Sequence, residues 1–113
     1  LYKIQVALTT TSRIDLVQNP YSGVVVNPTT ATSCPLGVAI YPIVASEFGW
    51  IQVSGPAVCL ADGTITVGTG LDASNGTAGA VEPHAEAGVQ APIGYAVTGI
   101  ATTEYGTVFL TIG

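Results

Sequence analysis

The chain has 113 residues, a formal net charge of -5 and only 8% charged residues, where about 25% is typical of soluble domains. With two basic residues, it lacks the lysines and arginines that bind nucleic-acid phosphates or anionic membrane surfaces, so neither is expected as a partner. No apolar run approaches the roughly 20 residues that a membrane-spanning helix needs. The length predicts a single domain, residues 1–113, and the scarcity of charge favours a surface partly covered by other subunits over a free domain rich in Thr and Ser.

Short runs of Val, Ile and Thr, separated by Gly and Pro, predict an all-β chain with almost no helix. Residues 1–33 contain a TTTS run and the stretch NPYSGVVVNPTTATSCP, which together predict a partly extended N-terminal arm that lies across a neighbouring subunit or a partner protein. The pair Asp62-Gly63 is the strongest short turn signal and predicts a hairpin between 57–61 and 64–68. The predicted strands, in chain order, are 3–8, 23–26, 37–43, 49–54, 57–60, 64–67, 80–81, 94–100 and 107–112.

Two twenty-residue stretches resemble each other, and the second begins 57 residues after the first. Residues 35–54 are PLGVAIYPIVASEFGWIQVS, and residues 92–111 are PIGYAVTGIATTEYGTVFLT. Each predicts a β-hairpin whose loop ends in a glycine at positive φ, where glycine is favoured. Two related hairpins indicate a compact pseudo-symmetric fold, either a β-barrel or a β-sandwich-like domain, in which closure or packing protects the strand edges.

Comparison of the two hairpins also indicates where a partner could bind. In the returning strands, one face is apolar in both copies and is predicted to be core. The other face differs, and it carries Trp50 in the first copy and Phe109 in the second. These two aromatic residues are candidate partner-binding residues, whereas most other aromatic residues are expected in the core. Glu47, Glu104 and Tyr105 are further candidates near the loop tips, although a carboxylate also suits a solvated turn.

The sequence offers little for catalysis. His84 is the only histidine, and the motifs of a nucleophile elbow or a phosphate-binding loop are absent from the sequence. Glu82, His84 and Glu86 alternate along the chain and could hold a divalent cation, or they could line a solvated loop. The prediction is therefore a protein that is not an enzyme and has no cofactor or metal, the alternative being an enzyme centred on His84. Cys34 and Cys59 form one disulfide if the chain is exported, or otherwise remain two buried free thiols.

A resemblance to a known class of proteins extends over residues 35–112. The runs GWIQVSGPAVCL, ITVGTGLDAS, TAGAV and IGYAVTGIATTEYGTVFLTI resemble small structural proteins of tailed bacteriophages, the capsid decoration or cement proteins. The resemblance implies a compact β-barrel-like subunit, commonly a homotrimer, that binds the major capsid protein and clamps neighbouring capsid subunits. It further implies assembly in the host cytoplasm and a final location on the capsid surface of the virion.

A second class of function is also compatible with the residues. A receptor-binding or glycan-binding β-module, in a virion knob or a secreted adhesin, is expected to expose an aromatic platform. If secreted, it is also expected to contain the Cys34–Cys59 disulfide.

Overall fold

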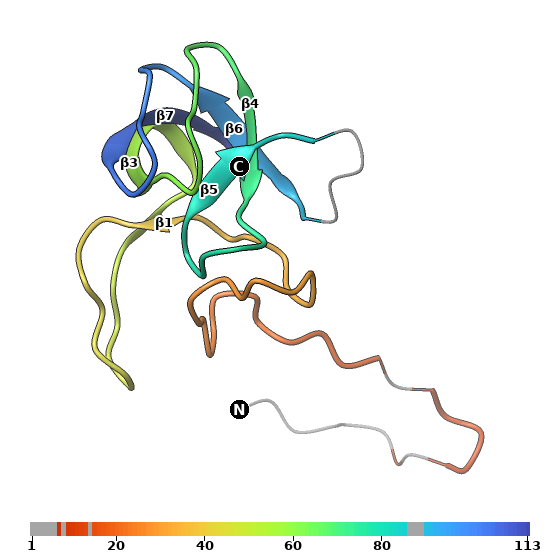
Figure 1. Cartoon of the computed structure of the whole chain (residues 1–113). Coiled ribbons are helices and arrows are strands. Elements are labelled where there is room, and N and C mark those ends of the chain that lie inside the picture. The colour runs from red at the N-terminus through yellow and green to blue at the C-terminus, as the bar shows by residue number, and fades with distance from the viewer. Residues whose placement is uncertain (1–6, 8, 14, 86–89) are drawn as a thin grey trace.

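The computed structural model describes residues 7, 9–13, 15–85 and 90–113, and within these ranges the chain forms strands and turns without a helix. The strands make two antiparallel sheets, one of order β1-β2 and one of order β3-β7-β6-β4-β5 (Figure 1). The predicted all-β, sandwich-like fold is confirmed. The strands are β1 (Val38–Ala39), β2 (Ile51–Gln52), β3 (Ser54–Leu60), β4 (Gly70–Ala73), β5 (Val81–Pro83), β6 (Pro92–Ala96) and β7 (Tyr105–Thr111).

The larger sheet is curved but does not close into a barrel, which corrects that alternative. Its edge strands are β3 and β5, and they approach each other through one isolated parallel bridge between Ala61 and Val81. Because β5 has three residues and already pairs with β4, it cannot supply a full ladder to β3. A barrel requires such a continuous ladder between the edges.

The core lies on one face of the larger sheet and follows the two-residue period of its strands. Along β3 and β7, inward-facing side chains are buried and alternate with more exposed ones, and Val108 and Leu110 have 0% exposure. The core is built of small and branched aliphatic residues. Its main members are Ala57, Cys59, Ile65, Leu71, Ile93, Ala96, Ile100, Val108 and Leu110.

The repeated sequence is a repeated structure. We call residues 35–54 the outer hairpin and residues 92–111 the core hairpin. In the outer hairpin Val38 pairs with Gln52, and in the core hairpin Tyr95 pairs with Phe109 at the same positions of the repeat. The loops also agree, because the Glu47 amide donates to the Val44 carbonyl over 3.1 Å and the corresponding pair, Glu104 and Ala101, is also 3.1 Å apart.

The predicted position of positive φ in these loops was wrong. The left-handed residues are Ser46, with φ 67°, and Thr103, with φ 65°, which are again equivalent. The loop glycines Gly49 and Gly106 serve a different purpose: a Cβ on either one would overlap the side chain of an isoleucine, Ile43 and Ile100 respectively.

The predicted hairpin at Asp62-Gly63 was also wrong. Gly63 does turn the chain, with φ 97°, but the segments on either side of it pair with the core hairpin instead of with each other. Residues 54–60 form a seven-residue ladder with β7, and Ile65 forms a bridge with Ile100. This arrangement buries the inward apolar residues of β3 against Val108 and Leu110, which a local two-strand hairpin does not achieve.

Other predicted strands differ from the observed ones. Residues 23–26 form no strand, 64–67 contribute only the bridge at Ile65, and residues 3–8 lie almost entirely outside the described residues. Strand β4 was not predicted, because its Gly and Asp residues are typical of turns.

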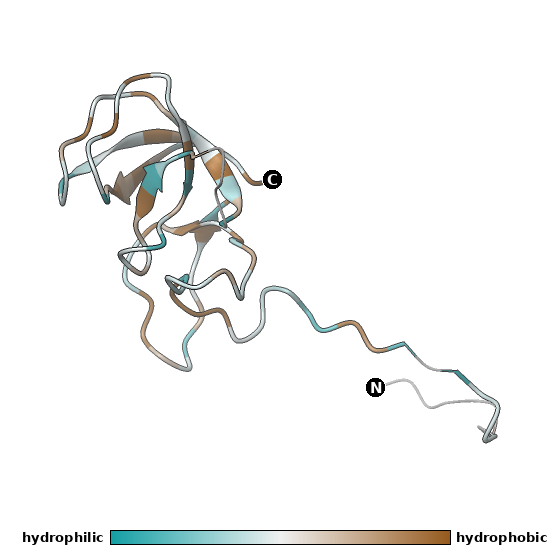
Figure 2. Ribbon diagram, turned by 45° about the vertical axis from the view of Figure 1, so that its right-hand side comes forward, coloured by the Kyte–Doolittle hydropathy of each residue, from teal (hydrophilic) through white to brown (hydrophobic). Residues whose placement is uncertain are grey.

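The described part of the N-terminal arm runs away from both sheets (Figure 1, Figure 2). It gives the molecule a longest dimension of 59 Å and a radius of gyration of 18.0 Å, where a compact chain of this length has about 13 Å. The arm joins the body at residues 27–29. There the Asn27 carbonyl accepts a 3.0 Å hydrogen bond from the Gly79 amide, and Gln90 Nε2 donates to the Thr29 carbonyl over 2.9 Å.

Candidate interaction surface

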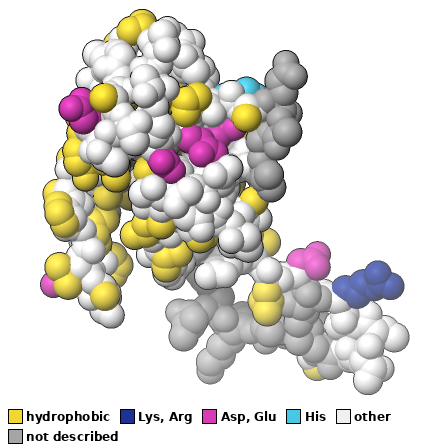
Figure 3. Space-filling model, in the orientation of Figure 1, with side chains coloured by type: hydrophobic (Ala, Val, Ile, Leu, Met, Phe, Trp, Pro, Cys, Tyr) yellow, Lys and Arg dark blue, Asp and Glu magenta, His cyan; other side chains and the backbone are white. Residues whose placement is uncertain are grey.

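The outer hairpin projects from the larger sheet and carries apolar side chains into solvent. Figure 3 shows hydrophobic side chains gathered along this projection, at the left of the view. Phe48 is fully exposed and Trp50 is 75% exposed, whereas their equivalents in the core hairpin are Tyr105 and Thr107. The other large exposed residues of the outer hairpin are Ile40, Tyr41, Ile43 and Val44.

Three aromatic residues surround a hollow at the base of the outer loop. Tyr41, Phe48 and Trp50, together with Gly49, line a volume of about 280 Å³ that opens to solvent. The absence of a Cβ at Gly49 lets the Ile43 side chain pack against the backbone of this lining residue. An aromatic-lined concavity of this size can receive an apolar side chain, and exposed Trp and Tyr residues are frequent anchors in interfaces.

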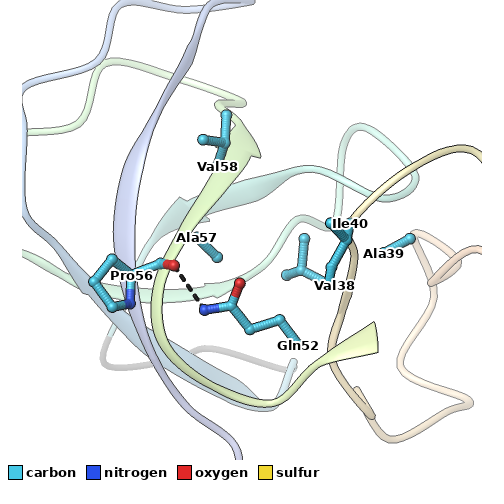
Figure 4. Close-up of a pocket in the computed structure, with 7 residues that line it drawn as sticks. All are labelled: Val38, Ala39, Ile40, Gln52, Pro56, Ala57 and Val58. Carbon is cyan, nitrogen blue, oxygen red and sulfur yellow. Dashed lines mark hydrogen bonds between the residues drawn. The ribbon is translucent and has the colours of Figure 1, made fainter. Parts of the chain in front are cut away.

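A second groove lies between the outer hairpin and β3 (Figure 4). It has a volume of about 210 Å³, and its lining includes Val38, Ile40, Pro56 and Val58. Gln52 crosses its floor, with Nε2 donating to the Pro56 carbonyl over 2.6 Å and to the Ser54 carbonyl over 3.0 Å. These bonds fix the angle at which the outer hairpin leaves β3, since they join β2 to the start of that strand.

The five predicted partner-binding residues do not form one site. Trp50 and Glu47 belong to the outer hairpin, and Phe109, Glu104 and Tyr105 belong to the core hairpin. Glu47, Glu104 and Tyr105 are exposed, so they are available for contact. Phe109 is half-buried because its ring stacks on Tyr95, with 5.2 Å between ring centroids and 13° between planes.

The expectation that most other aromatic residues are core residues was wrong. Every described aromatic residue except the half-buried Phe109 has at least two fifths of its side chain exposed, and none belongs to the buried cluster. The sequence signal that could have shown this is the aromatic content of the outer hairpin, where Tyr41, Phe48 and Trp50 replace the smaller or more polar Thr98, Tyr105 and Thr107.

A polar pair that the sequence did not predict joins β4 to the residue after β5. Asp72 is 2% exposed, and its Oδ2 lies 2.7 Å from Nδ1 of His84, whose side chain is half-exposed. Its other oxygen, Oδ1, is buried without a hydrogen-bond partner among the described residues. A single Asp inside the apolar run GLDAS was the available signal, since a buried carboxylate needs a partner.

The candidate metal trio, Glu82, His84 and Glu86, lies only partly within the described residues. Glu86 lies outside the described residues, and His84 directs Nδ1 to Asp72. In the part of the chain that the structure describes, no three His, Cys, Asp or Glu side chains are grouped so that they could hold a metal ion.

The two cysteines are free and differ in environment. Cys34 is exposed, just before the outer hairpin, and Cys59 is buried on β3. Burial raises the pKa of the Cys59 thiol from 9.0 to about 11, because the apolar surroundings disfavour the charged thiolate. Cys34 is therefore the reactive thiol of the folded chain.

Comparison of the chain with protein-family models, characterised proteins and solved structures gives no match. Among the described residues, no helix is long and apolar enough to cross a membrane.

Proposed function

We propose that this chain is a capsid decoration subunit, which binds an assembled phage shell and stabilises it through protein–protein contacts. The observation that carries the proposal is the outer hairpin, a projecting element with exposed aromatic and aliphatic side chains and one charged residue, Glu47. Large apolar patches on soluble proteins mark interaction sites. The resemblance of residues 35–112 to decoration proteins supports the major capsid protein as the partner.

The mechanism is binding linkage. A subunit that binds only the assembled shell lowers the free energy of that shell relative to its dissociated parts, and the effect grows with occupancy. The outer hairpin presents its anchors on a two-stranded element fixed at its base by the Gln52 hydrogen bonds. Fixed anchors lose less conformational freedom on binding than anchors on a flexible loop.

The test is co-expression with the major capsid protein of the same phage genome, followed by sedimentation and electron microscopy of the particles. We expect the chain on the shells at a regular stoichiometry. Trp50→Ala is expected to weaken binding by about 2 kcal/mol, or on the order of 30-fold, as for a buried interface anchor. The control is Val67→Ala, an exposed apolar residue between β3 and β4. Shells without the chain, or equal loss for both variants, would contradict the proposal.

The aromatic hollow supports glycan binding as a second candidate function, because sugar rings stack their apolar faces on aromatic side chains. Trp50 is the only tryptophan, so its fluorescence reports on this hollow alone. Saturable quenching by mono- or oligosaccharides in the isolated chain, abolished in Tyr41→Ala, would support this function. An unchanged emission spectrum across a sugar panel together with shell binding assigns the hollow to the capsid contact.

A further inference from the structure

The repeat of the two hairpins extends to the segments that precede them. In the second half of the chain, β4 and β5 precede the core hairpin. Moving back by 57 residues from β4 places RIDL (13–16) against GLDA, with Asp15 in the place of Asp72. Before β5 the offset is 56 residues: SGVVV (22–26) stands against AGAVE (78–82), Gly23 and Gly79 have φ 71° and 75°, and Val25 stands in the place of Val81. The first half therefore contains the same series of segments as the second.

The core hairpin shows how these segments are used. Strand β4 pairs with β6, with Gly70 opposite Tyr95, and β5 then pairs with the other edge of β4. Through this arrangement Ala73 and Val81 become buried core residues. The sheet around the core hairpin thus depends on segments that come earlier in the chain.

The outer hairpin has no equivalent pairing among the described residues, although the matching segments are present in the arm. Strand β1 pairs with β2 on one edge only. In the arm, Leu16 is 92% exposed and Val25 is 76% exposed, and these are the positions of the buried Ala73 and Val81. An apolar arm and an apolar hairpin are therefore both uncovered in the same molecule.

The attachment of the arm directs it away from its own hairpin. Residues 27 and 29 are bonded to Gly79 and Gln90 of the larger sheet, and the preceding residues run outward from there (Figure 2). The arm of a neighbouring molecule is attached to a different body, so this attachment does not prevent it from reaching the outer hairpin.

We propose that the chain self-associates by arm exchange, in which the arm of one copy covers the outer hairpin of a second copy. The segment of the first copy that carries Arg13, Asp15 and Leu16 lies antiparallel to β1 of the second copy, and residues 24–26 lie on its outer side. Within one molecule, the core hairpin has the strand order β6-β4-β5. The exchange forms the same order between two molecules, with β1 of one copy in the place of β6 and the two arm segments of the other copy in the places of β4 and β5. It buries Leu16 and Val25 and covers the free edge of β1, where an uncovered strand edge could pair with other chains.

The repeat supplies a matched pair of variants. Val25 and Val26 are adjacent, identical in type and both exposed in the single chain. Val25 occupies the position of the buried Val81, whereas Val26 occupies the position of Glu82, which already carries a carboxylate. Val25→Glu is therefore expected to abolish self-association and Val26→Glu to leave it intact, as measured by the molar mass of the full chain in sedimentation or light scattering. A monomeric unmodified chain at high concentration, or equal behaviour of the two variants, would overturn arm exchange.

Disulfide trapping tests the register and the donor of the arm. In a Cys34→Ser background, chains with Arg13→Cys are mixed with differently tagged chains with Val38→Cys, since these positions correspond to the pair Gly70 and Tyr95. Mild oxidation is expected to join the two kinds of chain, and Arg13→Cys with Ala39→Cys, one residue out of register, is expected to give at least tenfold less product. A cross-link formed only within one chain carrying both substitutions would overturn the exchange. Both tests are made without capsid, so they are independent of the proposed shell binding.

Discussion

The two hairpins of this chain have nearly the same backbone but opposite surroundings. Both show the same strand register, the same loop hydrogen bond and a left-handed residue at the same position. The core hairpin is flanked by β3 and β4 and contributes the buried Val108 and Leu110, whereas the outer hairpin exposes the residues around Trp50. Local sequence therefore determines the hairpin, and the neighbouring segments determine whether it belongs to a core or to an interaction surface.

The largest expected difference between the hairpins concerns one pair of isoleucines. Ile100 is buried in the core and Ile43 is its partly exposed equivalent, so the substitution to alanine is chemically the same at both sites. Ile100→Ala is expected to lower the free energy of unfolding by about 3 kcal/mol, and Ile43→Ala by less than about 1 kcal/mol. Urea unfolding of the monomeric chain gives both values. Equal losses would show that the outer hairpin is as well packed as the core hairpin.

The two thiols distinguish the edge of the outer hairpin from the core in a pH-dependent way. Folding raises the pKa of Cys59 from 9.0 to about 11. The contribution of the protonated Cys59 thiol to the free energy of unfolding is therefore fully present below pH 9 and is lost as the pH rises through 11. The loss is at most about 2.7 kcal/mol, at 1.36 kcal/mol per pH unit. Unfolding curves from pH 8 to 11 are expected to show this loss of unfolding free energy in the unmodified chain and in Cys34→Ser, but not in Cys59→Ala. At pH 8, a thiol reagent is expected to modify one cysteine of the folded chain and both after unfolding; rapid modification of two in the folded chain contradicts the burial of Cys59.

Two equivalent glycines test whether the close strand contact matters equally in both hairpins. A Cβ at Gly94 would overlap the Phe109 carbonyl, and a Cβ at Gly37 would lie 2.6 Å from the Gln52 carbonyl oxygen. Gly94→Ala is expected to destabilise the fold by about 2 kcal/mol, because strand β7 must shift. Gly37→Ala is expected to change the midpoint of thermal unfolding little but to disturb the Trp50 emission, since only the outer hairpin is affected. If Gly37→Ala destabilised the chain more than Gly94→Ala, the outer hairpin and not the core hairpin would be the main contributor to stability.

The smallest expected effect concerns the left-handed loop residues. Thr103 is β-branched and has φ 65°, a conformation that glycine adopts with less strain. Thr103→Gly is expected to stabilise the chain by about 1 kcal/mol, whereas Ser46→Gly is expected to change the global free energy of unfolding by a few tenths of a kcal/mol at most. Denaturant titration of the two variants measures both. A destabilised Thr103→Gly would mean that the loss of chain entropy outweighs the strain.

The sequence predicted the repeated hairpin and the all-β class because both depend on local periodicity and on glycines at fixed spacing. It did not predict β4, since Gly70 and Asp72 become strand residues only through pairing with β5 and β6. The local turn signal at Asp62-Gly63 was likewise overridden by the long ladder between β3 and β7. For the candidate site, the exposure of Trp50 could be predicted because Trp50 lies on the strand face whose residues differ between the two hairpins. The separation of Trp50 from Phe109 and the Asp72–His84 pair depend on tertiary packing that the pattern does not contain.

Amide hydrogen exchange at one equivalent pair tests the central claim, that the outer hairpin lacks the covering segments of the core hairpin until a partner supplies them. The Ile40 amide donates to the Trp50 carbonyl over 3.3 Å, and the equivalent Val97 amide donates to Thr107 over 3.0 Å. In the monomeric chain, Val97 is expected to exchange only with an opening close to global unfolding, and Ile40 at least a hundredfold faster. On self-association or shell binding, Ile40 is expected to become protected while Val97 is unchanged. Equal protection of the two amides in the monomer, or an Ile40 amide that stays unprotected in the assembly, would contradict the account.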